Sequence, residues 1–258
     1  MPPVAALKAL LPPDVDLDGE LRHEAARPVW LGVVWGRLGR GDHAWAYFDR
    51  VRLPELQPWI GAERGRLLRE LGHHAEAEAI EWRALIRAED PVDAAMLRIS
   101  LTADAVGFGD VARATSRLQA ARDAVAQLPG GPRAARQRLR LCWVSVEVAW
   151  LRGEQPPSDG LPVWDEGFRA PRFPSDHAAG STFHTAKGLL FGGVVRADPR
   201  LLDAAAREAP PALLWAVHLA RADAGRPDAR HAAREAQAVI VAPDGPFTQL
   251  ADEPSTST

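Results

Sequence analysis

Lysine, cysteine and asparagine are scarce in this chain of 258 residues, which holds two lysines, one cysteine and no asparagine. A single cysteine excludes an intrachain disulfide, so we expect a protein of a reducing compartment, the cytoplasm. No stretch reaches the ~18 uninterrupted apolar residues of a membrane-spanning helix, and the apolar run at the N-terminus is too short for a signal peptide. The net charge of −3 provides no global attraction to nucleic acid or to an anionic membrane.

Motifs of catalysis and cofactor binding are also missing. The sequence contains no H-E-x-x-H, G-x-S-x-G or C-x-x-C motif, and the stretch GSTFHTAKG at 180–188 lacks the residue order of a phosphate-binding loop. Cys142 lies in the apolar run LCWVSVEVAWL, where a thiol is usually an inert, buried hydrophobe. The sequence therefore predicts no catalytic site, no metal and no cofactor, and we expect a protein that is not an enzyme.

Several histidines and carboxylates stand close together without the spacing of a metal site. His73 and His74 are adjacent, so on a helix their rings point apart, and their place in a turn predicts solvated side chains. His177 and His184 are seven residues apart, which exceeds the one-turn spacing of a helical metal pair. We interpret five carboxylates as solvated side chains on helix faces or in turns: Glu76, Glu78, Glu81, Asp165 and Glu166.

What the chain does contain is helix-forming sequence, rich in Ala, Leu, Arg and Glu and broken by short Gly/Pro segments. Helices are predicted at 19–26, 29–38, 43–51, 59–71, 74–88, 92–106, 111–127, 133–151, 181–195, 199–208, 212–224 and 228–241. Short breaks between helices of this length predict antiparallel helical hairpins and not a sheet.

Two segments interrupt this pattern. Residues 153–176 carry five prolines and are too broken to form one helix, and 250–258 is a polar tail expected to be disordered. The predicted organisation is an N-terminal extension with a capping helix (1–24), helical repeats (25–152), a proline-rich loop (153–176), C-terminal helical hairpins (177–249) and the tail (250–258).

A spacing of small and large residues recurs in three frames, which begin at Gly32, Gly65 and Thr102. Each frame has a glycine where its first helix ends, an alanine five residues later, and a larger residue four positions beyond that alanine. The glycines are Gly39, Gly72 and Gly109, the alanines are Ala44, Ala77 and Ala114, and the larger residues are Phe48, Glu81 and Leu118. Glycine tolerates the left-handed backbone of a helix end, and alanine permits a close helix crossing that the larger residue then fills.

This pattern resembles the tetratricopeptide repeat, a helix–turn–helix unit of ~34 residues. The resemblance covers about 25–129 and returns at 212–243, where Gly225, Ala229 and Ala236 occupy similar places. It implies an all-α fold, a right-handed superhelix of antiparallel helical hairpins (a TPR-like α-solenoid). Generic helical hairpins without the superhelix are the alternative.

Such a superhelix has a concave groove lined by the first helix of each unit. The resemblance then implies partner-binding residues in this groove, with the proline-rich loop packing into it or closing over it. These residues are Arg37, Trp59, Arg66, Arg69, Met96, Ile99, Trp164 and Phe168. Arginine beside an apolar floor suits a protein or peptide with acidic and apolar side chains.

Two functions follow as hypotheses. The first is a non-catalytic protein- or peptide-binding scaffold. The second is a sensor or regulatory domain that binds a small ligand or partner, similar to the helical-repeat domains attached to bacterial transcription activators. Clamping of a chaperone's C-terminal carboxylate is disfavoured, because that subclass uses Lys and Asn and neither lysine lies in the repeats. Phosphate or nucleic-acid binding through Arg133, Arg136 and Arg140 is a weaker alternative.

The aromatic-rich stretch LGVVWGRLGRGDHAWAYF, residues 31–48, forms the turn and flanking helices of the first frame. Trp45 and Tyr47 have no place in the repeat pattern, and we expect them to pack against a neighbouring helix.

Overall fold

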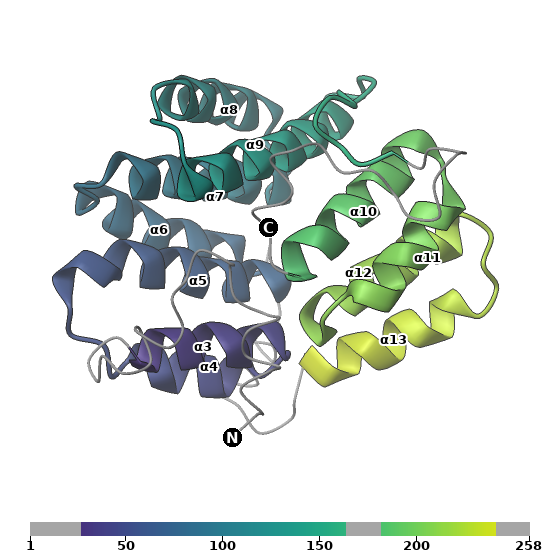
Figure 1. Ribbon diagram of the computed structural model, residues 1–258, viewed down its shortest axis with the longest axis horizontal. Coiled ribbons are helices and arrows are strands. Elements are labelled where there is room, and N and C mark those ends of the chain that lie inside the picture. The colour runs from purple at the N-terminus through teal and green to yellow at the C-terminus, as the bar shows by residue number, and fades with distance from the viewer. Residues whose placement is uncertain (1–26, 164–181, 241–258) are drawn as a thin grey trace, which may run out of the picture.

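The computed structural model describes residues 27–163 and 182–240, and every element in these two ranges is a helix (Figure 1). The first part comprises α3 (Arg27–Arg37), α4 (Gly41–Phe48), the 3₁₀ turn η1 (Pro54–Leu56), α5 (Gln57–Glu70), α6 (His74–Ile86), α7 (Pro91–Gly107), α8 (Val111–Ala126) and α9 (Pro132–Leu151). The second comprises α10 (Thr182–Arg196), α11 (Pro199–Glu208), α12 (Pro211–Asp223) and α13 (Ala229–Ile240). The all-α class is confirmed; the predicted helix at 19–26 and the tail lie outside the described residues.

Most helices pack in sequential pairs. Helix α3 packs on α4, α5 on α6, α7 on α8, α10 on α11 and α12 on α13. Helix α9 differs, because the described residues that follow it, 153–163, contain no helix. The chain is thus compatible with a helical repeat protein over its first three pairs, and the break falls where the prolines predict it.

The first helices of these pairs form a row that closes on itself. Along the chain, α3 contacts α5, α5 contacts α7, α7 contacts α9, α9 contacts α10, and α10 contacts α12. Helix α12 in turn contacts α3, so the six inner helices make a ring. In Figure 1 the helices α3 to α9 occupy one side of this ring and α10 to α13 the other.

Glycine ends the first helix of each of the three predicted frames. Gly39, Gly72 and Gly109 have φ angles of 79°, 84° and 71°, in the left-handed region that only glycine adopts without strain. Gly153 after α9 and Gly225 after α12 have the same conformation, with φ angles of 69° and 85°. The residues expected to stop these helices therefore do so.

The crossing of each pair is close where the frames place small residues. Ala44, Ala77 and Ala114 are fully buried. A Cβ atom on Gly32 would lie 2.5 Å from the Phe48 ring, and one on Gly65 would overlap the Glu81 carboxylate. The prediction that a small residue on one helix makes room for a large residue on the other is confirmed in these two pairs.

The aromatic residues of the first pair belong to its core. Trp45 packs against a cluster that includes Val33 and Phe48, and the Arg64 guanidinium carbon lies 4.9 Å from its ring centroid. Tyr47 is half-buried, with the Arg50 guanidinium carbon 5.0 Å from its ring centroid. Trp45 packs on the first pair's core, as expected, and the two residues do not form an exposed aromatic pair.

The described part of the proline-rich segment packs between α9 and α10. Leu161 is buried in a cluster with Trp143 of α9 and Phe191 of α10. Arg196, in the last turn of α10, donates to the carbonyl oxygen of Ser158 at 3.0 Å. None of the helices in the described ranges has the length and apolar character needed to cross a membrane.

The close crossing of α3 and α4 predicts the effect of a single methyl group. Gly32→Ala forces that methyl into the Phe48 ring, which outweighs the gain of about 1 kcal/mol in helix propensity. We expect a net loss of about 1–2 kcal/mol in the free energy of unfolding, measured by urea denaturation. Gly130→Ala is the control, because no atom lies within 4 Å of a Cβ there. Equal stability of the Gly32→Ala variant and the wild type would contradict the tight crossing.

Candidate functional site

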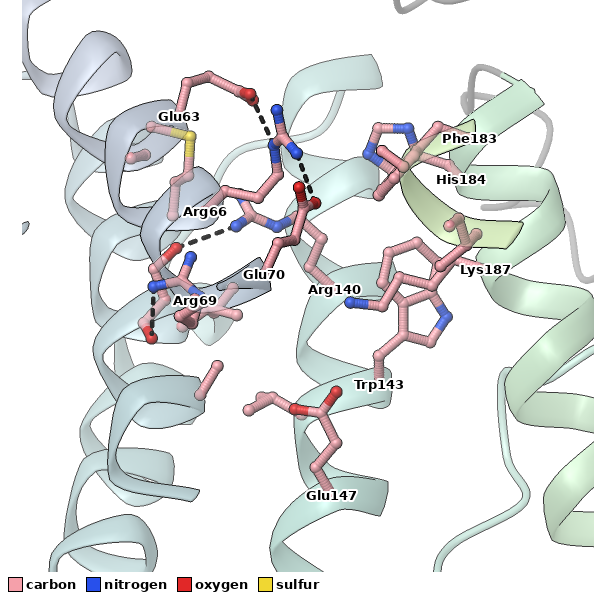
Figure 2. A pocket seen from close by; sticks show the side chains of 18 of the residues that line it. Glu63, Arg66, Arg69, Glu70, Arg140, Trp143, Glu147, Phe183, His184 and Lys187 are labelled. Carbon is pink, nitrogen blue, oxygen red and sulfur yellow. Dashed lines mark hydrogen bonds and ion pairs between the residues drawn. The ribbon is translucent and has the colours of Figure 1, made fainter. Parts of the chain in front are cut away.

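The ring of inner helices surrounds a pocket of about 430 Å³ that receives side chains from α3, α5, α7, α9, α10 and α12 (Figure 2). Six predicted binding residues line it together: Arg37, Trp59, Arg66, Arg69, Met96 and Ile99. Trp164 and Phe168, the other two, lie outside the described residues. The structure therefore brings the six together, and their role in binding a partner stays a prediction.

Helices α9 and α10 contribute many of the charged and aromatic side chains of the pocket, and the repeat pattern did not reveal them. Arg136, Arg140, Trp143 and Glu147 follow one face of α9 at spacings of four, three and four residues. His184, Lys187 and Phe191 follow one face of α10 in the same way. This helical spacing of charged and aromatic residues was the signal in the sequence that could have identified them.

The arginines of α9 do not form the single basic patch considered as a phosphate-binding surface. Arg133 is half-exposed and bonds to Asp90 at 2.7 Å and Asp93 at 2.8 Å. Arg136 and Arg140 instead line the interior of the ring. The patch is divided along the helix, because Arg133 stands in the first turn of α9, beside the two carboxylates at the start of α7, while Arg136 and Arg140 lie further along and reach the pocket.

One buried ionic network joins α3 and α5. Glu63 accepts from Arg37 Nη2 at 3.3 Å and from Arg66 Nε at 2.9 Å, and Arg66 Nη1 donates to Glu70 at 2.5 Å. Burial opposes ionisation of Glu63, but the charges of Arg37 and Arg66 outweigh it and lower its pKa to about 2. Burial lowers the pKa of Arg37 to about 10. Glu63 therefore stays ionised and ties the two arginines together.

A second network lies beneath Arg69. Its Nη1 donates to Glu81 Oε1 at 2.7 Å and to Asp104 Oδ1 at 3.0 Å, and both carboxyl groups are completely buried. The expectation that Glu81 is a solvated carboxylate was wrong. It occupies the place that Phe48 and Leu118 hold in the other pairs, and Gly65 leaves the room for it.

Glu81 and Asp104 are placed to share a proton. Glu81 Oε2 and Asp104 Oδ2 are buried and have no hydrogen-bond partner. Burial raises the pKa of Glu81 well above its ordinary value, and the Asp104 charge adds to this. Burial acts in the same direction on Asp104, but the neighbouring His74 imidazole and the charge of Arg69 hold its pKa below the usual range. These opposite directions favour Glu81 as the neutral acid of the pair and Asp104 as its carboxylate.

His74 also departs from the expectation of a solvated turn residue. It is the first residue of α6, its ring lies against the bare Cα of Gly107, and Nδ1 is 3.9 Å from Asp104. The side chain is 24% exposed and belongs to the pocket lining. Because position 107 has no side chain, there is room for the imidazole to lie over α7.

The wall opposite α5 is aromatic. The Trp143 ring stacks on Phe191 and on His184, with centroids 6.2 and 5.8 Å apart. Burial lowers the pKa of His184 well below its ordinary value, and the surrounding cations Arg37, Arg136, Arg140 and Lys187 lower it further. The imidazole is therefore neutral and forms part of this wall.

Arg140 is held by neutral partners. It donates to Ser100 Oγ at 3.0 Å and to Gln137 Oε1 at 3.3 Å, and no carboxylate in the described ranges pairs with it. Burial and the nearby Arg69 charge lower its pKa to about 10. Arg140 nevertheless remains a cation at neutral pH, without a counter-ion.

The pocket as a whole carries excess positive charge and unused hydrogen-bond donors. Six cationic side chains line it against three carboxylates; the cations are Arg37, Arg66, Arg69, Arg136, Arg140 and Lys187, and the carboxylates are Glu63, Glu70 and Glu147. Nε and Nη1 of Arg37 and Nε1 of Trp143 are buried without a hydrogen-bond partner. Buried donors are normally satisfied, so the site is suited to an anion rich in acceptor oxygens.

Within the described residues, no group of three or more His, Cys, Asp or Glu side chains could hold a metal ion. No protein-family model matches the chain. Comparison with the curated proteins gives no match, and comparison with the solved structures gives none either.

The shared proton predicts a non-additive pair of substitutions. Glu81→Gln or Asp104→Asn alone leaves one carboxylate to neutralise Arg69, so each is expected to lower the free energy of unfolding by about 1 kcal/mol or less. The double variant leaves Arg69 buried without a counter-ion and is expected to lose about 3–5 kcal/mol. Urea denaturation of the four proteins measures the cycle, and simple additivity would contradict the arrangement.

The same pair predicts how stability depends on pH. Protonated Glu81 stabilises the fold fully below the ordinary carboxyl pKa, and this contribution is lost as pH rises toward the raised pKa of the folded state. Glu81→Gln has no proton to lose, so its stability is expected to fall less steeply in that window. Glu76→Gln, an exposed position on the same helix, is the control. Identical pH slopes for wild type and Glu81→Gln would mean that Glu81 is ionised in the fold.

Proposed function

We propose that this protein is a non-catalytic binding domain, built on tetratricopeptide-like helical hairpins, whose central pocket takes a small organic anion. The repeat assignment is supported by the equivalent glycines and alanines of the first three pairs. The anion is supported by one observation above all, the excess of buried cations and unused donors in the pocket. A cytoplasmic location stays a prediction from the single cysteine.

A small ligand is favoured over an extended peptide by the closure of the ring. A peptide groove must be open along its length, whereas the contact of α12 with α3 closes the row of inner helices. A cavity of about 430 Å³ lies within the usual range for small-molecule sites. This supports the sensor or regulatory hypothesis over the protein-binding scaffold.

Nucleic acid is disfavoured as the anion. A duplex presents its phosphates on a wide surface, whereas Arg136 and Arg140 face the interior of a ring. Arg133, on the outside, is already paired with two carboxylates.

Arg140 provides the test, because it lines the pocket and its hydrogen bonds go to the neutral Ser100 and Gln137. Oxalate, succinate, citrate and phosphate are titrated into the protein by calorimetry, with the matching neutral amides as controls. At least one anion is expected to bind and raise Tm, and Arg140→Gln is expected to weaken that binding about tenfold or more, since a charged hydrogen bond is lost. Arg133→Gln, in the exposed first turn of the same helix and outside the pocket, is expected to bind as the wild type does.

Equal binding of the anions and their amides would contradict the proposed site, as would equal binding by the two arginine variants. Stabilisation by acidic peptides alone, with no response to any small anion, would support the protein-binding scaffold instead.

A further inference from the structure

Lys187 is an unusual lysine in this pocket. It is one of only two in the chain and projects from α10 alongside two stacked aromatic rings, with Nζ 5.2 Å from the Trp143 centroid and 5.6 Å from the Phe191 centroid. It makes no hydrogen bond and no ion pair with any residue of the described ranges. An ammonium ion without such a partner inside a fold is poorly solvated.

The surroundings make the charged form of the Lys187 amine less stable than it is in water. Burial lowers the pKa of Lys187, and the charges of Arg140 and Arg69 lower it further, while Glu147 opposes them. A lysine that is desolvated beside other cations holds a larger fraction of nucleophilic amine at neutral pH. Its side chain also lines the pocket, so a ligand bound there can reach the nitrogen.

We propose that Lys187 captures the carbonyl carbon of a 2-oxo acid as a reversible imine. This inference rests on the anion-binding function proposed above and names the ligand class. The Nζ lone pair attacks the ligand's carbonyl carbon, and the C=O π electrons move to oxygen. The nitrogen passes one of its two protons to that oxygen, which gives a carbinolamine. Its second proton leaves with the hydroxyl group as water while the C=N bond forms. Amine and carbonyl thus yield imine and water, with no oxidant or reductant.

Two side chains of α9 are placed to assist. Figure 2 shows Lys187 reaching across the pocket toward Arg140, with Glu147 further along the same helix. Arg140 has no counter-ion in the described ranges and would hold the ligand's carboxylate beside Nζ. Glu147 has the strongest favourable charge interaction with Lys187 and would carry the proton from nitrogen to the departing oxygen.

The scarcity of lysine makes the test sharp. The full chain is incubated with glyoxylate, the imine is reduced with cyanoborohydride, and the modified residues are identified by peptide mass spectrometry. Lys8 and the terminal amine are the internal references. At neutral pH we expect Lys187 to be labelled about tenfold or more faster than Lys8, since each unit of pKa changes the amine fraction tenfold. Its labelling is also expected to persist to lower pH.

Substitutions distinguish imine formation at Lys187 from simple binding of the anion by charge. Lys187→Arg keeps the cation, so it is expected to lose the label while still binding anions, with unchanged circular dichroism showing that it folds. Arg140→Gln is expected to raise the glyoxylate concentration needed for half-maximal labelling. Glu147→Gln is expected to slow labelling without changing that concentration. A neutral aldehyde, glycolaldehyde, is expected to label Lys187 less readily than glyoxylate does.

Glycolate, which has a hydroxyl in place of the aldehyde, distinguishes the two proposals. Labelling of Lys187 no faster than Lys8 overturns the imine, and if glycolate and glyoxylate still raise Tm, the anion site stands without it. A different result is selective labelling of Lys187 that is equally fast with glycolaldehyde and does not change in Arg140→Gln. That result would confirm a reactive amine and would overturn both the 2-oxo acid as its ligand and the anion site.

Discussion

The contact between α12 and α3 is the constraint on which the rest of the structure depends, because it turns a row of hairpins into a ring. Arg37 lies at this side of the ring. Its guanidinium carbon is 3.7 Å from the centroid of Phe183 on α10, while Nη2 bonds to Glu63 on α5. One side chain of α3 therefore reaches both halves of the ring. Closure removes the inner faces of the helices from bulk water, and the charges on those faces acquire their unusual properties only as a result.

Because they are buried, these charges contribute little to the stability of the fold. Moving an ion pair from water into a protein costs about as much as the pair regains, so buried ionic networks are weak evidence of a stabilising role. Glu63 and the Glu81–Asp104 pair neutralise part of the arginine charge. Arg140 and Lys187 have no carboxylate bonded to them in the described ranges. A core designed for stability alone would have apolar residues there, and this favours a site over a structural network.

Local signals in the sequence were sufficient to predict the helical hairpins. Gly39, Gly72 and Gly109 act through their own backbone, and Ala44 acts through a neighbour a few residues away, so spacing alone identifies them. Glu81 could not be assigned in this way, because a glutamate on a helix is normally solvated and its partners, Arg69 and Asp104, come from two other helices. The pocket wall of α9 and α10 was missed for a related reason. It exists only because the ring closes, through contacts between residues far apart in the sequence.

The described residues that follow α9 lie where the two halves of the ring meet. In the first three pairs an outer helix follows each inner one, whereas after α9 the described residues 153–163 form no helix. Leu161 from this segment lies in the cluster between Trp143 and Phe191, and a Cβ on Gly192 of α10 would lie 2.8 Å from the Pro162 carbonyl oxygen. These residues thus pack beside both α9 and α10. Helix α10 lies across the pocket from α5, so Lys187 faces the arginines of α5. The pocket is therefore completed by α10 and α12, the inner helices that follow the break in the repeat pattern.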